Sequence, residues 1–125
     1  MQDKILIVDD DDLVLACFER LLGRHFRVET VTGPHDALEA IRSRGPYAVV
    51  LSDLRMPGMN GVQLLEKAKE LAPNIVGLVL SGNAEPCDIK SSAVHRVLDK
   101  PCPTAVLTQA LSDAIVYHHT LSGSD

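Results

Sequence analysis

Acidic, hydroxyl and basic side chains stand directly after the short apolar runs of this sequence, where buried strands would end. They are Asp9 and Asp10 after Ile5–Val8, Asp53 after Tyr47–Ser52, Ser81 after Ile75–Leu80, and Lys100 after 96–99. Three neighbouring carboxylates raise one another's pKa, so such a set favours a hard divalent cation. Mg²⁺ suits it best, because this ion needs few protein ligands and keeps several waters. With an ammonium and a hydroxyl nearby, the set has the equipment for accepting a phosphoryl group on a carboxylate.

Each of these residues taken alone has an ordinary structural interpretation. Asp12 is the expected cap of the helix that follows it. Asp53 alone can be a turn residue, Ser81 can belong to an ordinary turn, and Lys100 can be a solvated side chain. Their coincidence at the ends of four predicted strands favours one shared site over unrelated roles.

A regular alternation of apolar runs and amphipathic stretches predicts the elements that must position this site. Continuous apolar runs predict buried strands, and apolar residues at helical spacing predict helices. The expected strands cover 5–8, 26–31, 47–52, 75–80 and 96–98, and the expected helices cover 12–22, 34–44, 62–71 and 103–118. The segment 84–94 has only a weak amphipathic pattern.

These units predict an α/β fold with a doubly wound, five-stranded parallel sheet covered by helices on both faces. Ligands of such sheets bind beyond the carboxyl ends of the strands, which is where the polar residues stand. A chain of 125 residues, 46% of them hydrophobic, is one domain's worth of sequence. We expect the domain to cover 1–120, with 121–125 as a tail or the start of a linker.

Composition and charge argue against several classes of protein. The net charge of −5, from 12 Lys and Arg against 17 Asp and Glu, argues against direct binding of nucleic acid or an anionic membrane. We find neither an apolar run long enough to span a membrane nor a signal-peptide pattern. Three cysteines without a paired spacing indicate reduced thiols and a cytoplasmic protein. Cys17 falls in a helical apolar pattern, which predicts a core position.

Four motifs carry a resemblance to a known family. They are Ile5-Leu-Ile-Val-Asp-Asp10, Leu51-Ser-Asp-Leu-Arg-Met-Pro-Gly-Met-Asn-Gly61, Leu80-Ser-Gly82 and Asp99-Lys-Pro101. In this order and spacing, essentially the whole chain closely resembles the receiver domain of two-component response regulators. The resemblance implies the flavodoxin-like (βα)5 receiver fold. It also implies a signalling domain that takes a phosphoryl group from a sensor histidine kinase or a histidine phosphotransfer protein, and then switches its partner or output interactions.

The resemblance implies roles in phosphoryl transfer for the matching residues. Asp53 would be the phosphoacceptor, Ser81 the switch hydroxyl, and Lys100 the partner of a phosphoryl oxygen. Asn83 would flank the phosphoryl group, and Pro101 would follow a cis peptide bond. Such a domain assists its own phosphorylation and dephosphorylation but is not a turnover enzyme.

The resemblance also implies a set of Mg²⁺ ligands. Asp10 and Asp53 would bind the ion directly, and Asp9 would help to hold it through water. The backbone carbonyl of Arg55 would be a further ligand, while its side chain would flank the phosphoryl group and could reach toward Glu85.

Two departures from the usual receiver pattern affect the signalling step. Strand five carries Val97 where receivers often have an aromatic residue, so the usual rotating aromatic is missing. The interval from Ser81 to Lys100 is short, which predicts a short or irregular fourth helix within 84–94. Together with His95 and Cys102, this resembles receivers attached to metal-dependent phosphohydrolase-like output domains of the HD-GYP and HDOD types. The chain would then be the N-terminal part of a longer protein.

Other functions remain as alternatives to the phosphorylated switch. The missing aromatic and the short fourth helix are consistent with a phosphorylation-independent interaction module on the same fold. The last helix and strand five could also support a homodimer. An aspartyl phosphohydrolase is disfavoured, because Arg55 stands where such enzymes need a second acid. A nucleotide-binding enzyme is disfavoured as well, because the acidic run 9–12 replaces a glycine-rich phosphate loop.

Overall fold

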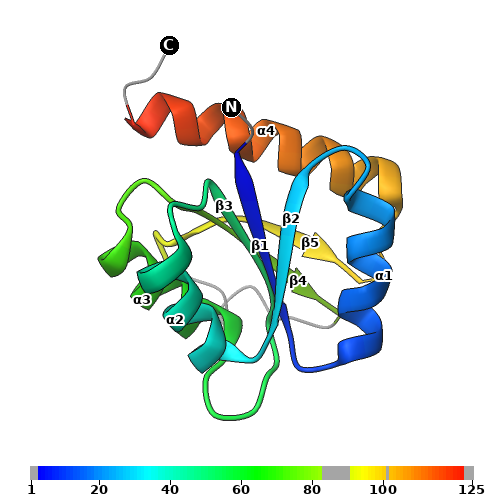
Figure 1. The fold of residues 1–125 in the computed structure, drawn as a ribbon, viewed down its shortest axis with the longest axis horizontal. Helices are drawn as coiled ribbons and strands as arrows, with labels where there is room; N and C mark the ends of the chain where they lie inside the picture. Colours follow the sequence, from blue (N-terminus) through cyan, green and yellow to red (C-terminus); the bar gives the residue numbers. More distant parts are fainter. Residues whose placement is uncertain (1–2, 83–90, 101, 123–125) are drawn as a thin grey trace.

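The computed structural model describes residues 3–82, 91–100 and 102–122, and it forms a five-stranded parallel sheet with helices on both faces (Figure 1). The strands are β1 (Lys4–Asp9), β2 (Arg27–Thr32), β3 (Val49–Asp53), β4 (Val76–Ser81) and β5 (Val94–Asp99). The helices are α1 (Asp12–Leu22), α2 (Pro34–Arg44), α3 (Gly61–Leu71) and α4 (Thr104–Ser122). The strand order is β2-β1-β3-β4-β5, and every neighbouring pair is parallel. The predicted doubly wound α/β fold is confirmed.

Alternation along the strands divides the core into two layers. Ile5 and Ile7 of β1 belong to the layer under α1 and α4, whereas Leu6 and Val8 belong to the layer under α2 and α3. All four side chains are almost completely buried. Because both faces of the sheet are covered by helices, the strand is apolar at every one of these positions rather than at alternate ones.

Single positions of α1 differ from the sequence expectation. Leu15 and Leu22 are its buried residues, Leu21 is exposed, and Cys17 is exposed rather than in the core. Successive residues of an α-helix are rotated by about 100°, so an error of one residue in the predicted pattern assigns a side chain to a different face of the helix. The cap is also different, because Asp11, not Asp12, accepts a hydrogen bond at this helix end, from the backbone N–H of Leu13.

The last two elements are longer than their sequence patterns predict. β5 begins at Val94 rather than Arg96, and α4 continues to Ser122, beyond the expected end near His118. Leu121 packs against the core layer under α4. The expectations for a short fourth helix, for Asn83 and Glu85, and for a cis bond before Pro101 lie outside the described residues. The described chain does contain a cis peptide bond, between Gly45 and Pro46.

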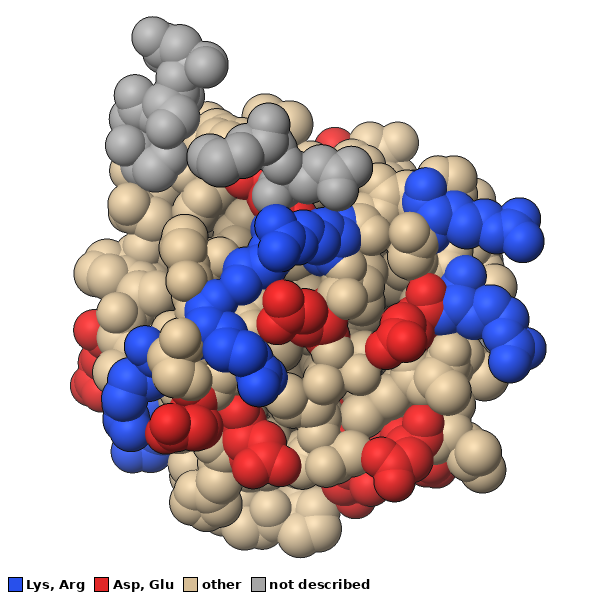
Figure 2. All heavy atoms as spheres, in the orientation of Figure 1, with Lys and Arg blue, Asp and Glu red and all other residues tan. Residues whose placement is uncertain are grey.

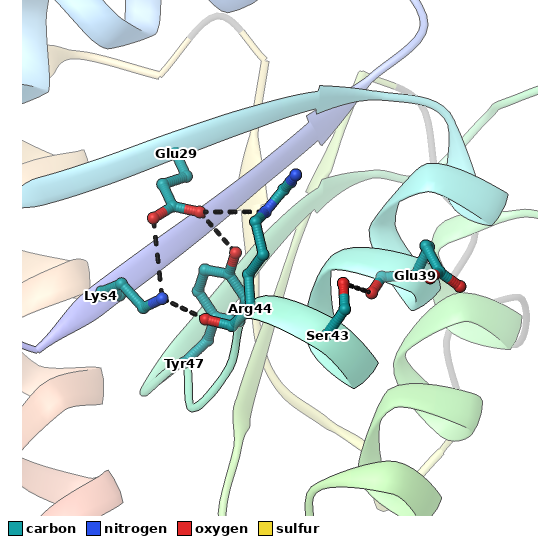
Figure 3. A network of polar contacts seen from close by, with 6 residues as sticks. All are labelled: Lys4, Glu29, Glu39, Ser43, Arg44 and Tyr47. Atoms are coloured by element: carbon teal, nitrogen blue, oxygen red, sulfur yellow. Dashed lines mark hydrogen bonds and ion pairs between the residues drawn. The ribbon is translucent and has the colours of Figure 1, made fainter.

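A polar network ties the beginnings of β1 and β3 to β2 and the end of α2 (Figure 3). The Tyr47 hydroxyl donates a hydrogen bond of 2.5 Å to Glu29, and the Glu29 carboxylate lies 3.7 Å from both Lys4 Nζ and Arg44 Nε. Lys4 Nζ also lies 4.5 Å from the centre of the Tyr47 ring and donates to the Arg44 carbonyl. Burial and the hydrogen bond to Glu29 both raise the pKa of Tyr47. None of the described helices is long and apolar enough to cross a membrane.

Candidate functional site

The carboxyl ends of β1 and β3 bring three aspartates together at one edge of the sheet. Asp9 ends β1, Asp53 ends β3, and Asp10 follows β1 directly. One carboxylate oxygen from each of these three residues lies within 4.8 Å of the other two. Parallel strands place their carboxyl ends at a common edge, so the fold itself creates this acidic cluster.

Lys100 supplies a positive charge to this cluster. Its Nζ lies 2.9 Å from Asp53 Oδ1 and 4.0 Å from Asp9 Oδ2. The Lys100 side chain is 36% exposed, whereas those of Asp53 and Asp9 are 14% and 4% exposed. The lysine therefore reaches from the surface to neutralise two carboxylates that have lost most of their water.

Asp9 is the most deeply buried carboxylate of the cluster. Loss of water raises the pKa of its carboxyl, and the charge of Asp53 raises it further. A hydrogen bond of 3.0 Å from the Asp11 backbone N–H and the charge of Lys100 act in the opposite direction but do not prevent the rise. An additional cation at this site would relieve the cost, because it would favour the charged form.

The loop after Asp53 is fixed by backbone hydrogen bonds on both sides. The N–H of Leu54 donates to the Leu80 carbonyl at 2.9 Å, and the N–H of Gly61 donates to the Leu54 carbonyl at 2.8 Å. A Cβ atom on Gly61 would lie 2.5 Å from the Asp53 carbonyl oxygen, so only glycine allows α3 to begin this close to Asp53. The helix start is further held by a reciprocal pair of hydrogen bonds between Asn60 and Gln63.

Ser81 and Lys100 are joined through the main chain. Ser81 ends β4, is only 5% exposed, and pairs in register with Asp99 of β5. The Lys100 N–H donates a 3.0 Å hydrogen bond to the Ser81 carbonyl. This bond holds the ends of β4 and β5 together at the site.

The remaining predicted residues lie around the site at the surface. Arg55 is exposed, two residues after the end of β3 on the loop that leads to α3. Val97 on β5 is 40% exposed and leaves no aromatic ring at this position. An aromatic pair that the sequence analysis missed lies on the same strand: His95 stacks on Tyr117 of α4, with ring centres 4.3 Å apart and planes 16° apart. Residues so distant in the sequence give no local signal of such a pair.

The donor chemistry of the cluster fits a magnesium ion. Asp9, Asp10 and Asp53 supply only carboxylate oxygens, and Asp10 is exposed, which leaves room for water ligands. Hard oxygen ligands combined with retained water are the typical environment of Mg²⁺.

Comparison with known proteins identifies the family of this chain. The family model of the response regulator receiver domain matches residues 5–112. The chain therefore belongs to the receiver domains of two-component response regulators. Members of this class are signalling domains rather than turnover enzymes.

Individual relatives support the same assignment. The chain is 36% identical over 108 residues to the hydrogenase transcriptional regulatory protein HoxA of Cupriavidus necator, covering 81% of this chain and 22% of that protein. It is 34% identical over 82 residues to the DNA-binding transcriptional regulator NtrC of Escherichia coli, covering 65% of this chain and 17% of that protein. The chain thus spans about a fifth of the length of these two regulators.

Solved structures give the same fold. A structure described as adenylate cyclase from Rhodopirellula baltica has a TM-score of 0.92 and 32% identity, with 98% of this chain and 94% of that chain covered. The signal receiver domain of an HD domain-containing protein from Pseudomonas fluorescens has a TM-score of 0.89, with 96% and 99% covered. Its identity of 24% makes it evidence for the fold alone.

Proposed function

We propose that Asp53 accepts a phosphoryl group and that this modification switches the interactions of the domain. The observation that carries the proposal is the contact of 2.9 Å between Lys100 Nζ and Asp53 Oδ1, at the edge of a cluster of three carboxylates. The lysine stabilises the negative charge of Asp53, and the same ammonium can pair with a phosphoryl oxygen.

In the transfer step, a carboxylate oxygen of Asp53 forms a bond to phosphorus as the bond from phosphorus to a histidine nitrogen of the donor breaks. The nitrogen keeps the electron pair. Lys100 follows the negative charge from the Asp53 carboxylate to the phosphoryl oxygens. Charge neutralisation and positioning account for most of the catalysis in such transfers.

Asp10 and Asp53 are the proposed direct ligands of a magnesium ion, with the Arg55 backbone carbonyl as a third ligand and Asp9 acting through water. When bound, Mg²⁺ neutralises charge on the phosphoryl oxygens. The Asp9 carboxylate and the Lys100 ammonium would then complete the charge balance around the ion and the phosphoryl group. With these groups the domain would assist its own phosphorylation and the later loss of the phosphoryl group, and Arg55, whose side chain is exposed, is the residue proposed to affect the attacking water.

Ser81 is the proposed switch residue. Its hydroxyl would bind a phosphoryl oxygen, and the main-chain bond from Lys100 to Ser81 would transmit the movement to β5. Val97 replaces the usual aromatic reporter on this strand, so the exposed surface of β5 and α4 would carry the change instead. This surface is also the proposed place for a homodimer contact.

The partners follow from the family and from the length of the relatives. A sensor histidine kinase or histidine phosphotransfer protein would donate the phosphoryl group in the cytoplasm. The domain would end near residue 120, and an output domain would follow in a longer protein. The HD-GYP or HDOD type of output remains one proposal, and the transcriptional regulators HoxA and NtrC suggest another type.

The phosphorylation test uses acetyl phosphate or beryllofluoride with Mg²⁺, and mass spectrometry or NMR as the readout. We expect one adduct on the wild type and none on Asp53→Asn. Absence of an adduct on a wild-type chain that binds Mg²⁺ would refute the proposal. The alternative of a phosphorylation-independent module predicts that both proteins bind a partner equally under phosphorylating conditions.

A further inference from the structure

A groove separate from the phosphoryl site runs along the outer strand β2, between α1 and α2. It has a volume of about 510 Å³, and the last residues of β2, Thr30 to Thr32, lie along its floor. This size falls within the roughly 300–1,000 Å³ of ordinary ligand sites. Figure 1 shows β2 between the two helices, which cover opposite faces of the sheet.

The floor of the groove is an open strand edge. In the part of the chain that the structure describes, β2 pairs only with β1. In a strand, the N–H and C=O groups of one residue point to the same side, and those of the next residue point to the opposite side. Half of the β2 residues therefore direct their N–H and C=O groups away from β1, where they are available to another strand. Such an edge is a ready template for an added strand.

Both walls of the groove are acidic. α1 contributes Asp12 and Glu19, and α2 contributes Asp36 and Glu39. The single cation of the lining is Arg44, which is paired with Glu29. Figure 2, drawn in the orientation of Figure 1, shows carboxylates spread across the region between the two helices.

Local structure explains only half of these carboxylates. Asp12 and Asp36 lie in the first turns of their helices, where a negative charge stabilises the helix end. Glu19 and Glu39 lie beyond the first turn. Glu19 accepts a long hydrogen bond of 3.3 Å from Thr30, and Glu39 pairs at 3.6 Å with Arg42 in a contact that is about two-thirds exposed on both sides. Exposed contacts of this kind are weak, so both carboxylates can bind a better partner.

The charge of the walls selects the occupant. A second copy of this chain, paired edge to edge, would bring its own four wall carboxylates against these four. Like charges at that distance repel, so the groove is unfavourable for self-association through β2. An extended segment rich in lysine or arginine has the complementary charge.

We infer that the groove between α1 and α2 binds an extended basic segment of a partner protein, which adds to the sheet as a strand beside β2. Successive side chains of an added strand alternate between the faces of the sheet. One set would point toward Asp12 and Glu19, and the other toward Asp36 and Glu39. The segment should therefore carry adjacent basic residues rather than basic residues at every second position. This inference does not depend on phosphorylation of Asp53.

The test titrates ¹⁵N-labelled protein with the capped peptide Lys-Arg-Val-Lys-Arg-Val, which presents two cations to each wall. We expect saturable shifts of the β2 amides and their neighbours in α1 and α2. The double variant Glu19→Gln with Glu39→Gln should weaken binding about three- to tenfold, as for two partly exposed ion pairs. The control variant Glu66→Gln with Glu70→Gln removes the same charge from α3 and should leave the affinity unchanged.

Two peptide analogues test strand addition itself. One is N-methylated at the odd backbone amides and the other at the even ones, so one of them cannot donate to β2. We expect that analogue to bind at least tenfold more weakly and the other to bind like the parent peptide. The inference would be overturned if both analogues bound equally or if the two double variants lost the same affinity. It would also be overturned by shifts centred on Asp9, Asp10 and Asp53, or by the absence of a saturable shift at millimolar peptide. Acetyl phosphate labelling of Asp53 is measured separately, so failure here leaves the phosphoacceptor proposal unaffected.

Discussion

Replacing Asp9 by asparagine is expected to stabilise the metal-free domain, although it removes a charge that contacts Lys100. The attraction to Lys100 and the repulsion from Asp53 nearly cancel, and the exposed Asp10 carboxylate, which also lies within 4.8 Å of Asp9, adds further repulsion. At an effective dielectric constant of about 20, attraction to Lys100 at 4.0 Å is worth about 4 kcal/mol, and repulsion from Asp53 within 4.8 Å is at least about 3.5 kcal/mol.

The desolvation and the hydrogen bonding of Asp9 decide whether the variant is more or less stable than the wild type. Taking a carboxylate out of water costs several kcal/mol, and the Asp9 side chain is only 4% exposed. The hydrogen bond from Asp11 N–H offsets about 1.5–3 kcal/mol of this, and the asparagine amide oxygen retains part of it. We therefore expect a gain of about 1 kcal/mol in the free energy of unfolding. With a urea slope of about 2 kcal/mol/M, the midpoint rises by about 0.5 M.

The assay is urea unfolding of wild type and Asp9→Asn in EDTA, with Asp113→Asn on the exposed face of α4 as a matched control. The pKa of Asp9 is raised in the folded protein, so the native state holds its proton to higher pH than the unfolded chain. The charge of Asp9 therefore costs stability above the unfolded value of about 3.9. The gain from the variant should be present at pH 7 and vanish in more acidic solution, where Asp9 is protonated in both states.

Magnesium should remove the stability advantage of the variant. An ion at ten times its dissociation constant stabilises the wild type by about 1.4 kcal/mol, and the variant should gain less because it binds the ion more weakly. If Asp9→Asn is less stable than wild type in EDTA, with an unchanged urea slope, then the attraction to Lys100 outweighs desolvation and the reasoning is wrong. The same conclusion follows if Asp113→Asn gives an equal gain.

Three further predictions concern the scaffold. Gly61→Ala should cost about 1–3 kcal/mol and slow labelling of Asp53 by acetyl phosphate, because the new Cβ would crowd the Asp53 carbonyl; unchanged stability and labelling would contradict this. The pKa of Tyr47 is raised, so its contribution to stability is full below pH 10 and is lost as the pH rises above it. Unfolding curves from pH 8 to 11 should therefore fall more steeply for wild type than for Tyr47→Phe, and parallel curves would exclude a role for the phenol. Leu111→Ala should cost about 2–5 kcal/mol in urea unfolding, because Leu111 is fully buried on the inner face of α4; a cost below 1 kcal/mol would mean that this layer repacks.

The apolar runs and the polar residues that follow them were enough to predict the architecture and the location of the site. A short run in which every residue is apolar, such as Ile5–Val8, is typical of a strand that is buried on both faces. The alternation of such strands with helices predicts a parallel sheet. That sheet places Asp9, Asp53 and Ser81 at one edge, whatever the details of packing. The motifs at these strand ends then carried the family resemblance, which the comparisons confirmed.

The pairing of the charges depends on how the strands pack and could not be predicted from spacing. Sequence spacing predicts that Lys100 comes near the acids, but the distances of 2.9 Å to Asp53 and 4.0 Å to Asp9 depend on the register of β5 against β4. The loss of water around Asp9, which raises its pKa, also depends on groups that are far away in the sequence.

Helix orientation and surface shape were equally beyond local patterns. The phase of α1 is set by its packing on the sheet, which buries Leu22 as the pattern predicts but leaves Leu21 and Cys17 exposed. The acidic groove exists because α1 and α2 lie on opposite faces at the open edge of β2. Neither helix sequence contains that information, because a groove is a relation between elements that only folding brings together.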